Sequence, residues 1–308
     1  MEHFLFTIDD SYEGERADKL LPLLLEGVSR SYLKGIIDEG ALIINGKVSK
    51  GKVRVKEGDI LEFDLPEAES PDIPAQDIPL DILYEDDDII VVNKPKGMVV
   101  HPSAGHFTDT LVNALLYHCK DSLSGINGVL RPGIVHRIDK DTTGSIVACK
   151  NDDAHRALSD QFKVHSINRV YKAICLGNIK DDEGAVDAPI GRNMNDRKKM
   201  GIVPDGKRAV THYRVLERFG DYTYIECRLE TGRTHQIRVH MSSIGHPLLG
   251  DAVYGNASSS LNKRFNLDGQ TLHAQILGFE HPSKGEYIEF SAPLPEYFSH
   301  LLDVLRIK

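Results

Sequence analysis

The chain has 308 residues, of which 41% are hydrophobic and 27% charged, and its formal net charge is -9. That length fits one large domain with a smaller one, and the composition is that of an ordinary soluble globular protein. No apolar run approaches the roughly 20 residues that a membrane span needs, and residues 1–10 lack the basic and apolar regions of a signal peptide. The cysteines, Cys119, Cys149, Cys175 and Cys227, form no CxxC pair, so reduced thiols in a cytoplasmic protein are expected.

The first part of the sequence predicts a small unit of two helices followed by short strands. Residues 16–27 (RADKLLPLLLEG) place apolar side chains on one helical face, and residues 29–40 (SRSYLKGIIDEG) predict a second helix. Residues 41–50 then predict a strand with an Asn-Gly turn, and residues 58–65 predict a further strand. This order of elements resembles the S4-type RNA-binding domain, and we expect such a domain over residues 1–65.

Charge is segregated along the chain, although its total is acidic. Residues 16–60 hold nine Lys or Arg against six Asp or Glu, whereas residues 62–88 hold eleven acidic residues and no Lys or Arg. A local basic patch can bind phosphates in a protein of negative net charge, but it can also be a solvated face of a small domain. Because S4-type domains present basic residues to phosphates, the candidate RNA contacts in this unit are Arg30, Lys34 and Lys47.

Residues 66–88 (PEAESPDIPAQDIPLDILYEDDD) separate this unit from the rest of the chain. They contain four prolines and no Lys or Arg. A segment of this composition cannot bury much apolar surface, so we expect an extended linker there. The remaining residues, 89–308, would then form a second domain.

The second domain is predicted to be rich in strands. Helices are predicted at residues 112–120 and 152–162. Many strands with few interposed helices indicate an α+β domain built on a mixed, largely antiparallel sheet. The predicted strands are 89–95, 145–150, 169–177, 210–219, 222–231, 235–241 and 287–294.

Motifs of several common site types are absent from the sequence. It contains no GxxxxGK[ST] phosphate loop, no GxGxxG after a strand, no GxSxG elbow and no HExxH pair. Its fourteen histidines never take a zinc-ligand spacing with cysteines. We therefore expect neither a metal ion nor a nucleotide cofactor.

Three polar segments remain as candidates for chemistry: residues 93–116, 131–144 and 229–251. The second (RPGIVHRIDKDTTG) gathers cations around the carboxylate of Asp139, as a salt-bridged turn or a reactive site would, and these cations favour its ionised form. In the third, five polar or charged residues crowd into eight positions, and if that stretch is a strand, Gln236, Arg238 and His240 share one of its faces. A buried strand face rarely carries so many cations unless they meet anions. The five are Arg233, His235, Gln236, Arg238 and His240.

Taken together, these segments resemble the RluA family of pseudouridine synthases. The similarity lies in NKPxGxxVHP, GIVHRIDKDTTG, RVYKAICLG and TGRTHQIRVHM followed by GHPLLGD, which occur in the family's order. With the S4-type unit before them, they are most similar to the branch that modifies large-subunit ribosomal RNA. The departures are mild, among them Asp109 where the family frequently has Gly. The resemblance implies a catalytic domain of the pseudouridine synthase type, which isomerises uridine in RNA.

The resemblance also implies roles for individual residues. Asp139 would be the essential carboxylate, acting by covalent addition or by helping to remove a sugar proton, and Arg233 would be its salt-bridge partner. Arg137 would fill the gap left by the flipped base, and Tyr171 would stack on the target uracil. The candidate pocket walls are Ile237 and Leu248, and the further candidate RNA contacts are His136, Lys140, Lys94 and Lys172.

Two other functions fit parts of the sequence. A catalytically silent RNA-binding protein of ribosome assembly would have no need of Asp139, Tyr171 and Arg233 together. A hydrolase that used Asp139 on a small anionic substrate would leave the basic N-terminal unit unexplained. We therefore expect a cytoplasmic, monomeric pseudouridine synthase without a cofactor or a membrane partner. Its expected substrate is large-subunit ribosomal RNA, free or in a pre-ribosomal particle, with transfer RNA as the alternative.

Overall fold

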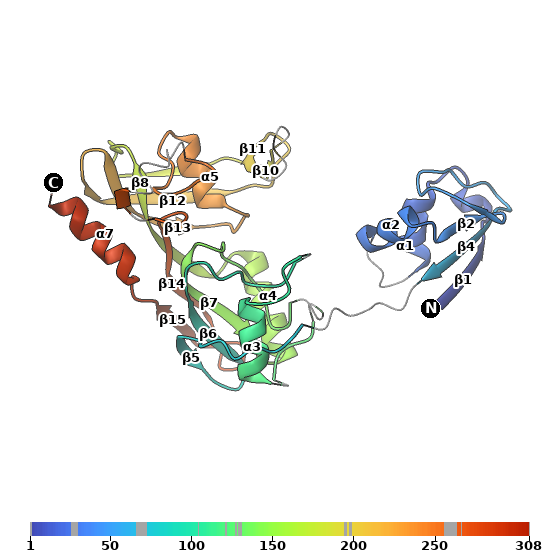
Figure 1. Cartoon of the computed structure of the whole chain (residues 1–308), viewed down its shortest axis with the longest axis horizontal. Coiled ribbons are helices and arrows are strands. Elements are labelled where there is room, and N and C mark those ends of the chain that lie inside the picture. The colour runs from blue at the N-terminus through green and yellow to red at the C-terminus, as the bar shows by residue number, and fades with distance from the viewer. Residues whose placement is uncertain are drawn as a thin grey trace. The chain divides into compact units, whose positions relative to one another are not determined.

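The computed structural model divides the chain into two compact units, Met1–Pro71 and Asp72–Lys308, each with its own hydrophobic core (Figure 1). No helix in the described part of the chain is long and apolar enough to cross a bilayer. The four cysteines are free and buried, as the sequence predicts. The structure describes residues 2–25, 30–65, 73–103, 105–120, 122–126, 128, 131–193, 196, 199–255, 264–265 and 267–307.

The smaller unit is a four-stranded antiparallel sheet in the order β1-β4-β2-β3, with two helices packed on it. Leu20 of α1, Leu33 of α2 and Phe63 of β4 meet in its core. The predicted helices and strands are present, and β1 is a strand that the sequence analysis missed. The elements are β1 (Glu2–Thr7), η1 (Asp10–Tyr12), α1 (Ala17–Leu24), α2 (Arg30–Asp38), β2 (Leu42–Ile44), β3 (Lys47–Val48) and β4 (Ile60–Leu65).

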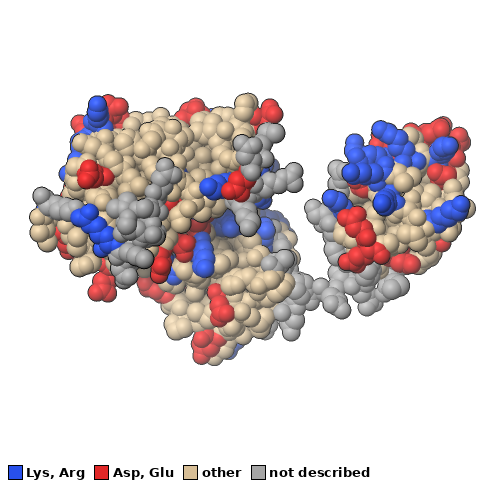
Figure 2. Space-filling model, turned by 45° about the horizontal axis from the view of Figure 1, so that its top comes forward, with Lys and Arg blue, Asp and Glu red and all other residues tan. Residues whose placement is uncertain are grey.

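Basic side chains gather on the surface of the smaller unit (Figure 2). Lys34 of α2 is exposed and borders a hollow of about 500 Å³ together with Lys50 and Lys52. Lys47 is exposed on β3. Arg30 begins α2, but its side chain lies outside the described part of the chain.

The predicted linker is wrong at its C-terminal end. Residues 82–85 form β5 (Ile82–Glu85), which pairs antiparallel with β6 (Ile89–Lys94) in the larger unit. The turn between them is held by Asp86, whose Oδ1 accepts hydrogen bonds from the backbone N–H groups of Asp88 and Ile89 at 2.9 and 3.0 Å. Acidic residues that suggested a solvated linker therefore stabilise a hairpin, because carboxylates can satisfy turn amides.

The larger unit is built on a nine-stranded sheet in the order β5-β6-β7-β14-β8-β13-β12-β9, with β15 paired to β14. The β14–β7 pair is parallel and the other pairs are antiparallel, which confirms a mixed, largely antiparallel α+β fold. A separate hairpin joins β10 (Ile190–Arg192) to β11 (Met200–Ile202). The other strands are β7 (Thr143–Cys149), β8 (Asn168–Leu176), β9 (Glu183–Asp187), β12 (Val210–Arg218), β13 (Tyr222–Leu229), β14 (Leu272–Glu280) and β15 (Tyr287–Ser291).

Helices cover both faces of this sheet. Alternate residues of β6 divide between two cores, since Ile90 and Val92 lie in one cluster and Ile89 and Val91 in another. The first cluster includes residues of α3 (Leu111–Cys119) and α5 (Gln236–Ser243), and the second includes residues of α4 (Asp152–Val164). A further cluster packs α7 (Glu296–Arg306) against Ile174 of β8.

Residues 235–241 are not the predicted strand. Gln236–Ser243 is the helix α5, and six of its eight residues are buried. A helix that is buried on every side lacks the polar stripe by which a helical period is recognised, so its sequence can be mistaken for a strand. The faces assigned to Gln236, Arg238 and His240 on a strand are wrong for the same reason.

Candidate active site

Asp139 lies in the loop that leads into β7. Its side chain is 18% exposed, and its backbone carbonyl accepts a hydrogen bond from the N–H of Thr142 at 3.1 Å. The neighbouring Ile138 is buried in the core beneath the sheet. This apolar anchor fixes the loop so that the next carboxylate points into a cavity.

Lys94 braces this loop from inside the protein. It is fully buried, and its Nζ donates hydrogen bonds to the carbonyl oxygens of Pro95, Met98 and Lys140 at 2.8–2.9 Å. Burial lowers the pKa of Lys94 to about 7. The predicted RNA contact at Lys94 is therefore wrong, because its ammonium group is used to tie two turns together.

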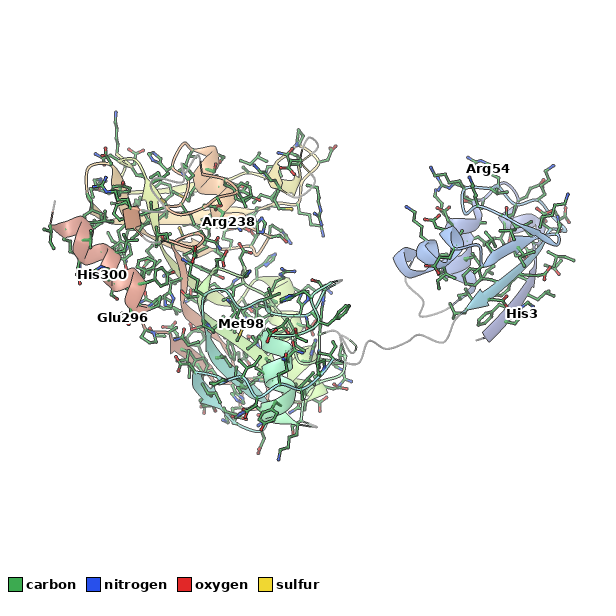
Figure 3. The ribbon with its side chains drawn as sticks, viewed as in Figure 1. His3, Arg54, Met98, Arg238, Glu296 and His300 are labelled. Atoms are coloured by element: carbon green, nitrogen blue, oxygen red, sulfur yellow. The ribbon has the colours of Figure 1, made fainter. Side chains whose placement is uncertain are left out.

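The charge partner of Asp139 is Arg238. Its Nη1 donates to Asp139 Oδ2 at 2.8 Å, while its Nε and Nη2 donate to the two carboxylate oxygens of Asp251 at 2.7 and 3.0 Å. Arg238, labelled below α5 in Figure 3, is only 7% exposed, and Asp251 is fully buried. One guanidinium thus joins a half-open carboxylate to a buried one in the bidentate geometry that arginine favours.

The predicted pairing of Asp139 with Arg233 is wrong. Arg233 is half-buried at the mouth of the same cavity, and its Nε donates to the carbonyl of Arg208 at 3.0 Å. The sequence analysis identified the correct segment but the wrong arginine. On a helix, Arg238 can reach inward from α5, whereas a strand would have separated it from the loop.

Burial and the neighbouring charges have opposite effects on the pKa values of Arg238 and Asp251. Burial opposes the charge of Arg238, but hydrogen bonds and attraction from Asp251 and Asp139 outweigh it and raise the pKa of Arg238. Burial likewise opposes the charge of Asp251, and Arg238 lowers the pKa of that carboxyl overall. Both partners therefore stay ionised at neutral pH.

The backbone before α5 is shaped to deliver Arg238. His235 takes a left-handed conformation with φ 57°, and Gln236 then begins the helix. The Gln236 Oε1 accepts from the Thr231 hydroxyl and from the Arg233 N–H at 2.8 and 3.0 Å, while its Nε2 donates to the Val210 carbonyl. These bonds fix the start of the helix to β12 and to the end of β13.

His235 and Tyr254 form a second contact to the carboxylate. His235 Nε2 is 3.8 Å from Asp139 Oδ1, and its Nδ1 shares a hydrogen bond of 2.7 Å with the Tyr254 hydroxyl. That hydroxyl also accepts from the Met200 N–H at 2.9 Å, and Arg238 lies over the Tyr254 ring at 5.0 Å. Burial lowers the pKa of His235, so the imidazole is neutral at pH 7.

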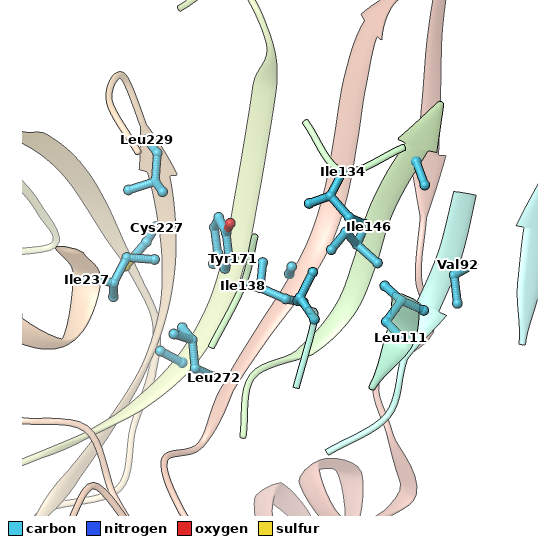
Figure 4. Close-up of a cluster of buried hydrophobic side chains, with 14 of the residues drawn as sticks. Val92, Leu111, Ile134, Ile138, Ile146, Tyr171, Cys227, Leu229, Ile237 and Leu272 are labelled. Carbon is cyan, nitrogen blue, oxygen red and sulfur yellow. The ribbon is translucent and has the colours of Figure 1, made fainter. Parts of the chain in front are cut away.

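Tyr171 forms one wall of the cavity that Asp139 enters. It lies on β8 between Cys227 of β13 and Ala274 of β14, and its ring is largely buried (Figure 4). An inner cavity of about 50 Å³ is lined by Tyr171, Asp139 and Ile237, and a wider one of about 540 Å³ opens beside it. Burial raises the pKa of Tyr171, and the charge of Asp139 adds to this, so its hydroxyl stays protonated.

A carboxylate held between an arginine and a histidine, opposite a buried tyrosine, suits chemistry on a flat, uncharged ring. The family model for RNA pseudouridylate synthase matches residues 88–243, which include Asp139, Tyr171 and Arg238. An RNA pseudouridine synthase of Bacillus subtilis is 50% identical over 99% of both chains. The chain belongs to the RluA family of RNA pseudouridine synthases. As a member, it is an isomerase that converts uridine to pseudouridine in RNA.

Other pseudouridine synthases share the similarity over nearly the whole chain. The ribosomal large subunit pseudouridine synthase D of Zymomonas mobilis is 49% identical over 98% of this chain and 97% of its own. The protein of that name in Pseudomonas aeruginosa is 47% identical over 95% of this chain and 92% of its own. Among solved structures, human RNA pseudouridylate synthase domain containing 1 covers 76% of this chain and 98% of its own, with a TM-score of 0.57 and 26% identity.

Arg137 and Lys140 occupy the open side of this synthase site. Arg137 is exposed, and its Nη1 donates to His101 Nε2 at 3.3 Å, at the rim of the cavity that holds Asp139. The Lys140 side chain is exposed next to it. Both positions agree with the predicted RNA-facing roles, which stay predictions.

Three predicted RNA or pocket residues have structural roles instead. His136 Nε2 accepts from the Val147 N–H at 3.0 Å, and burial lowers the pKa of this imidazole to about 3. Lys172 forms a 2.7 Å ion pair with Glu226. Leu248 is fully buried behind the pocket wall, whereas Ile237 lines the inner cavity as predicted.

Several residues that build the site are not predicted from the sequence. Arg238 and His235 stand out there only as members of a polar cluster, and Asp251 and Tyr254 do not stand out as site residues. Asp251 is a buried carboxylate thirteen positions after Arg238, and such a residue signals a buried cation. Sequence pattern alone does not reveal which cation it meets.

Proposed function

We propose that this synthase acts on large-subunit ribosomal RNA, with Asp139 as its essential carboxylate. The observation that carries the catalytic assignment is the 2.8 Å ion pair from Arg238, which fixes Asp139 at the mouth of a cavity walled by Tyr171. The substrate assignment is supported by relatives at 49% and 47% identity whose names state a ribosomal large subunit target. The segregated basic surface of the smaller unit agrees with it.

Isomerisation requires the uridine to leave the base stack and enter the cavity. Extruding a base costs a few kcal/mol, and stacking on an aromatic ring recovers about 1–3 kcal/mol. Tyr171 supplies that ring, and Ile237 closes the cavity with an apolar surface. Arg137, exposed at the rim, is placed to fill the space that the base leaves.

Asp139 can act on the sugar as an ionised carboxylate. Arg238 holds one of its oxygens and leaves Oδ1 directed toward the neutral imidazole of His235, 3.8 Å away. Breaking the glycosidic bond and rejoining the base through carbon involves no net oxidation. The protein therefore has to orient the uridine and supply the charged carboxylate. The buried Asp251 keeps Arg238 in place while Asp139 reacts.

The smaller unit would dock the RNA as an S4-like domain. Its two helices and short sheet carry exposed lysines, among them Lys34, Lys47, Lys50 and Lys52. Neutralising backbone phosphates with lysines gives affinity that falls steeply with salt. We also assign the protein to the cytoplasm, where its ribosomal substrate and its free thiols belong together.

A comparison of pseudouridine maps tests the substrate. RNA from a strain lacking this gene should lose pseudouridine at one or more sites of large-subunit ribosomal RNA, and the wild-type gene should restore them. The Asp139→Asn gene should not. Loss of pseudouridine only from transfer RNA would contradict the proposal.

A further inference from the structure

Arg169 is a buried cation near Asp139 and the first residue of the RVYKAICLG motif, and neither the sequence analysis nor the mechanism above gives it a role. It lies on β8 two residues before Tyr171, so both side chains project from the same face of the strand. Arg169 is 7% exposed and lines the 540 Å³ cavity that also holds Asp139 and Tyr171. Its guanidinium is therefore buried in protein on most sides and open to the substrate cavity.

This guanidinium has almost no partners. Its Nη2 donates a long hydrogen bond of 3.4 Å to the carbonyl of Glu230, and its Nε is buried without any hydrogen bond. Among the described residues, no carboxylate forms an ion pair with it. Arg238, equally buried, is bonded to two carboxylates. Arginine has five N–H donors, and leaving them unpaired in the interior is costly.

The groups around Arg169 make its charge less favourable. Burial lowers the pKa of Arg169, and the charge of Arg233 lowers it further. The cations Arg137, Lys163 and Arg233 line the same cavity. Asp139 lies there too, but Arg238 already holds it. An excess of positive charge around a vacant hydrogen-bonding fork favours an anionic ligand.

Gly232 makes room for this arrangement. It lines the same cavity, and a Cβ atom at this position would collide with Nη1 of Arg169. The glycine therefore lets the guanidinium lie flat beside the turn that follows β13. Phe162 supports it from the side of α4, with its ring 5.8 Å from the guanidinium carbon.

We propose that Arg169 binds a backbone phosphate of the RNA strand next to the uridine that enters the site. This inference rests on the proposed function and assigns a phosphate subsite to the same cavity. A guanidinium fork matches the oxygens of a phosphate in bidentate geometry. Because Arg169 and Tyr171 are separated by about 7 Å along one strand face, one nucleotide strand can reach both. The phosphate would supply the negative charge that Arg169 does not receive from any carboxylate among the described residues.

The test exploits the cost of the unpaired charge. Arg169→Met removes the charge but keeps a long apolar side chain, and Arg306→Met removes an exposed arginine that is paired with Glu217. Each variant and the wild type are unfolded by heat without RNA. Their Kd values for a large-subunit ribosomal RNA transcript are then measured over a range of salt concentrations.

Arg169→Met should keep the Tm of the wild type or exceed it, because no ion pair is lost. It should weaken RNA binding roughly tenfold and reduce the slope of log Kd against log salt by about 0.7. Arg306→Met should leave both RNA quantities unchanged. A Kd and a slope equal to those of the wild type in Arg169→Met would overturn the phosphate site. The phosphate site would also be overturned if Arg169→Met lowered the Tm more than Arg306→Met does, or failed to fold, because the guanidinium would then have a structural role.

Two further readouts separate the possible sources of the result. Inorganic phosphate is added without RNA at constant ionic strength. One outcome is that phosphate raises the Tm of the wild type but not that of Arg169→Met, while the slopes of log Kd against log salt for RNA are equal in the two proteins. That result would show that Arg169 binds a free phosphate ion and not the RNA backbone. Tritium release from the transcript labelled with 5-[³H]uridine is scored on the wild type alone, so its absence would contradict the proposed function without changing the comparison between variants.

Discussion

Arg238 bonds two carboxylates that differ in exposure, and this difference gives them different tasks. Asp251 is fully buried and receives two N–H donors from Arg238 and two from the backbone of Val253 and Tyr254. It can only hold the guanidinium. Asp139 is 18% exposed and receives one donor from Arg238, so it keeps oxygen lone pairs free for substrate. Asp251 thus anchors the guanidinium, and Asp139 stays accessible, as its proposed catalytic role requires.

Replacing Arg238 should be far more damaging than replacing Arg233. Arg238→Gln leaves Asp251 buried without its cation, and such a loss costs about 3–5 kcal/mol of unfolding free energy. It should also abolish most activity, because Asp139 loses its orientation. Arg233→Gln removes a half-buried side chain whose Nε bonds a carbonyl, so its Tm should stay within a few degrees of the wild type.

Thermal unfolding and tritium release measure both effects. Arg233→Gln serves as the matched control, since it removes the same group from the same segment. Equal losses of Tm in the two variants would contradict the assignment of Arg238 as the support of Asp139.

The sequence predicted the segment that contains the charge partner of Asp139, but not the partner itself, and the catalytic role of Asp139 stays a prediction. Asp139 stands in a short motif whose chemistry is visible locally. The choice between Arg233 and Arg238 depends on whether residues 236–243 form a strand or a helix, and Gln236 decides this through bonds to Val210 and Thr211 in β12. Val210 and Thr211 lie 26 and 25 positions before Gln236 in the sequence. Local periodicity contains no such information.

At the scale of single elements, turn residues determine where α3 begins. Thr110 caps the helix by exchanging hydrogen bonds with Asn113, and Asp109 before it adopts a φ of 60°. A left-handed backbone suits glycine, and aspartate tolerates it better than most residues. The left-handed backbone is therefore compatible both with Asp109 and with the Gly that the family resemblance implies at this position.

Substitutions at Asp109 should follow that backbone requirement. The unfolding free energy of Asp109→Ala should be about 1 kcal/mol lower than that of Asp109→Gly, because alanine is strained at positive φ. Denaturant unfolding of the two variants measures the difference. Both lose the same carboxylate contacts to Thr108 and Gln76, so those contacts cancel in the comparison. Equal stabilities would show that the backbone there relaxes.

The turn between β5 and β6 depends on the ionised form of Asp86. Burial opposes that charge, but hydrogen bonds from Lys284, from two backbone amides and from Tyr84 outweigh burial and lower the pKa of Asp86. His281, buried at the same carboxylate, is 2.8 Å away. The Asp86 carboxylate therefore joins the hairpin to the segment after β14, and Asp88 adds a hydrogen bond from the Ser283 hydroxyl.

A depressed carboxyl pKa stabilises the fold above the unfolded-state value of about 4 and stops doing so as the pH falls through the folded-state value. Asp86→Asn should lower the unfolding free energy at pH 7 by about 2 kcal/mol. The difference from the wild type should shrink below about pH 4, because the carboxyl of the unfolded chain takes up a proton there while the native carboxylate is still ionised. Unfolding in denaturant at several pH values tests this. A difference that is constant from pH 7 to pH 3 would exclude the charge as its cause.

For the whole molecule, the two units have separate cores. The sequence predicted their number and six of the eleven strands described in the larger one, β6, β7, β8, β12, β13 and β15, because periodicity and turn residues mark such elements locally. It did not predict β5, β9, β10, β11 or β14. It misplaced the boundary, since the acidic residues of β5 and its turn look like linker until their partners, His281 and Lys284, are known. Those partners lie almost two hundred residues away, at separations of 195 and 198.

The lysines around the hollow of the smaller unit should govern RNA affinity. Combined Lys34→Glu, Lys50→Glu and Lys52→Glu reversals should weaken binding of ribosomal RNA by about a hundredfold at 0.1 M salt and flatten its salt dependence. The Tm should change little, because all three side chains are exposed. Lys180→Glu, at an exposed position of the larger unit, is compared with the single Lys34→Glu variant, because each changes the net charge by the same amount. An unchanged Kd in the triple variant would contradict RNA docking by this unit.

Isomerisation by Asp139 is tested most directly by tritium release from ribosomal RNA labelled with 5-[³H]uridine. Asp139→Asn should release tritium at least about a thousandfold more slowly than the wild type, while its Kd for the same RNA stays within a few fold. The amide keeps the shape of the carboxylate and can still meet Arg238. Turnover near the wild-type rate in Asp139→Asn would contradict the assignment of Asp139 as the essential carboxylate.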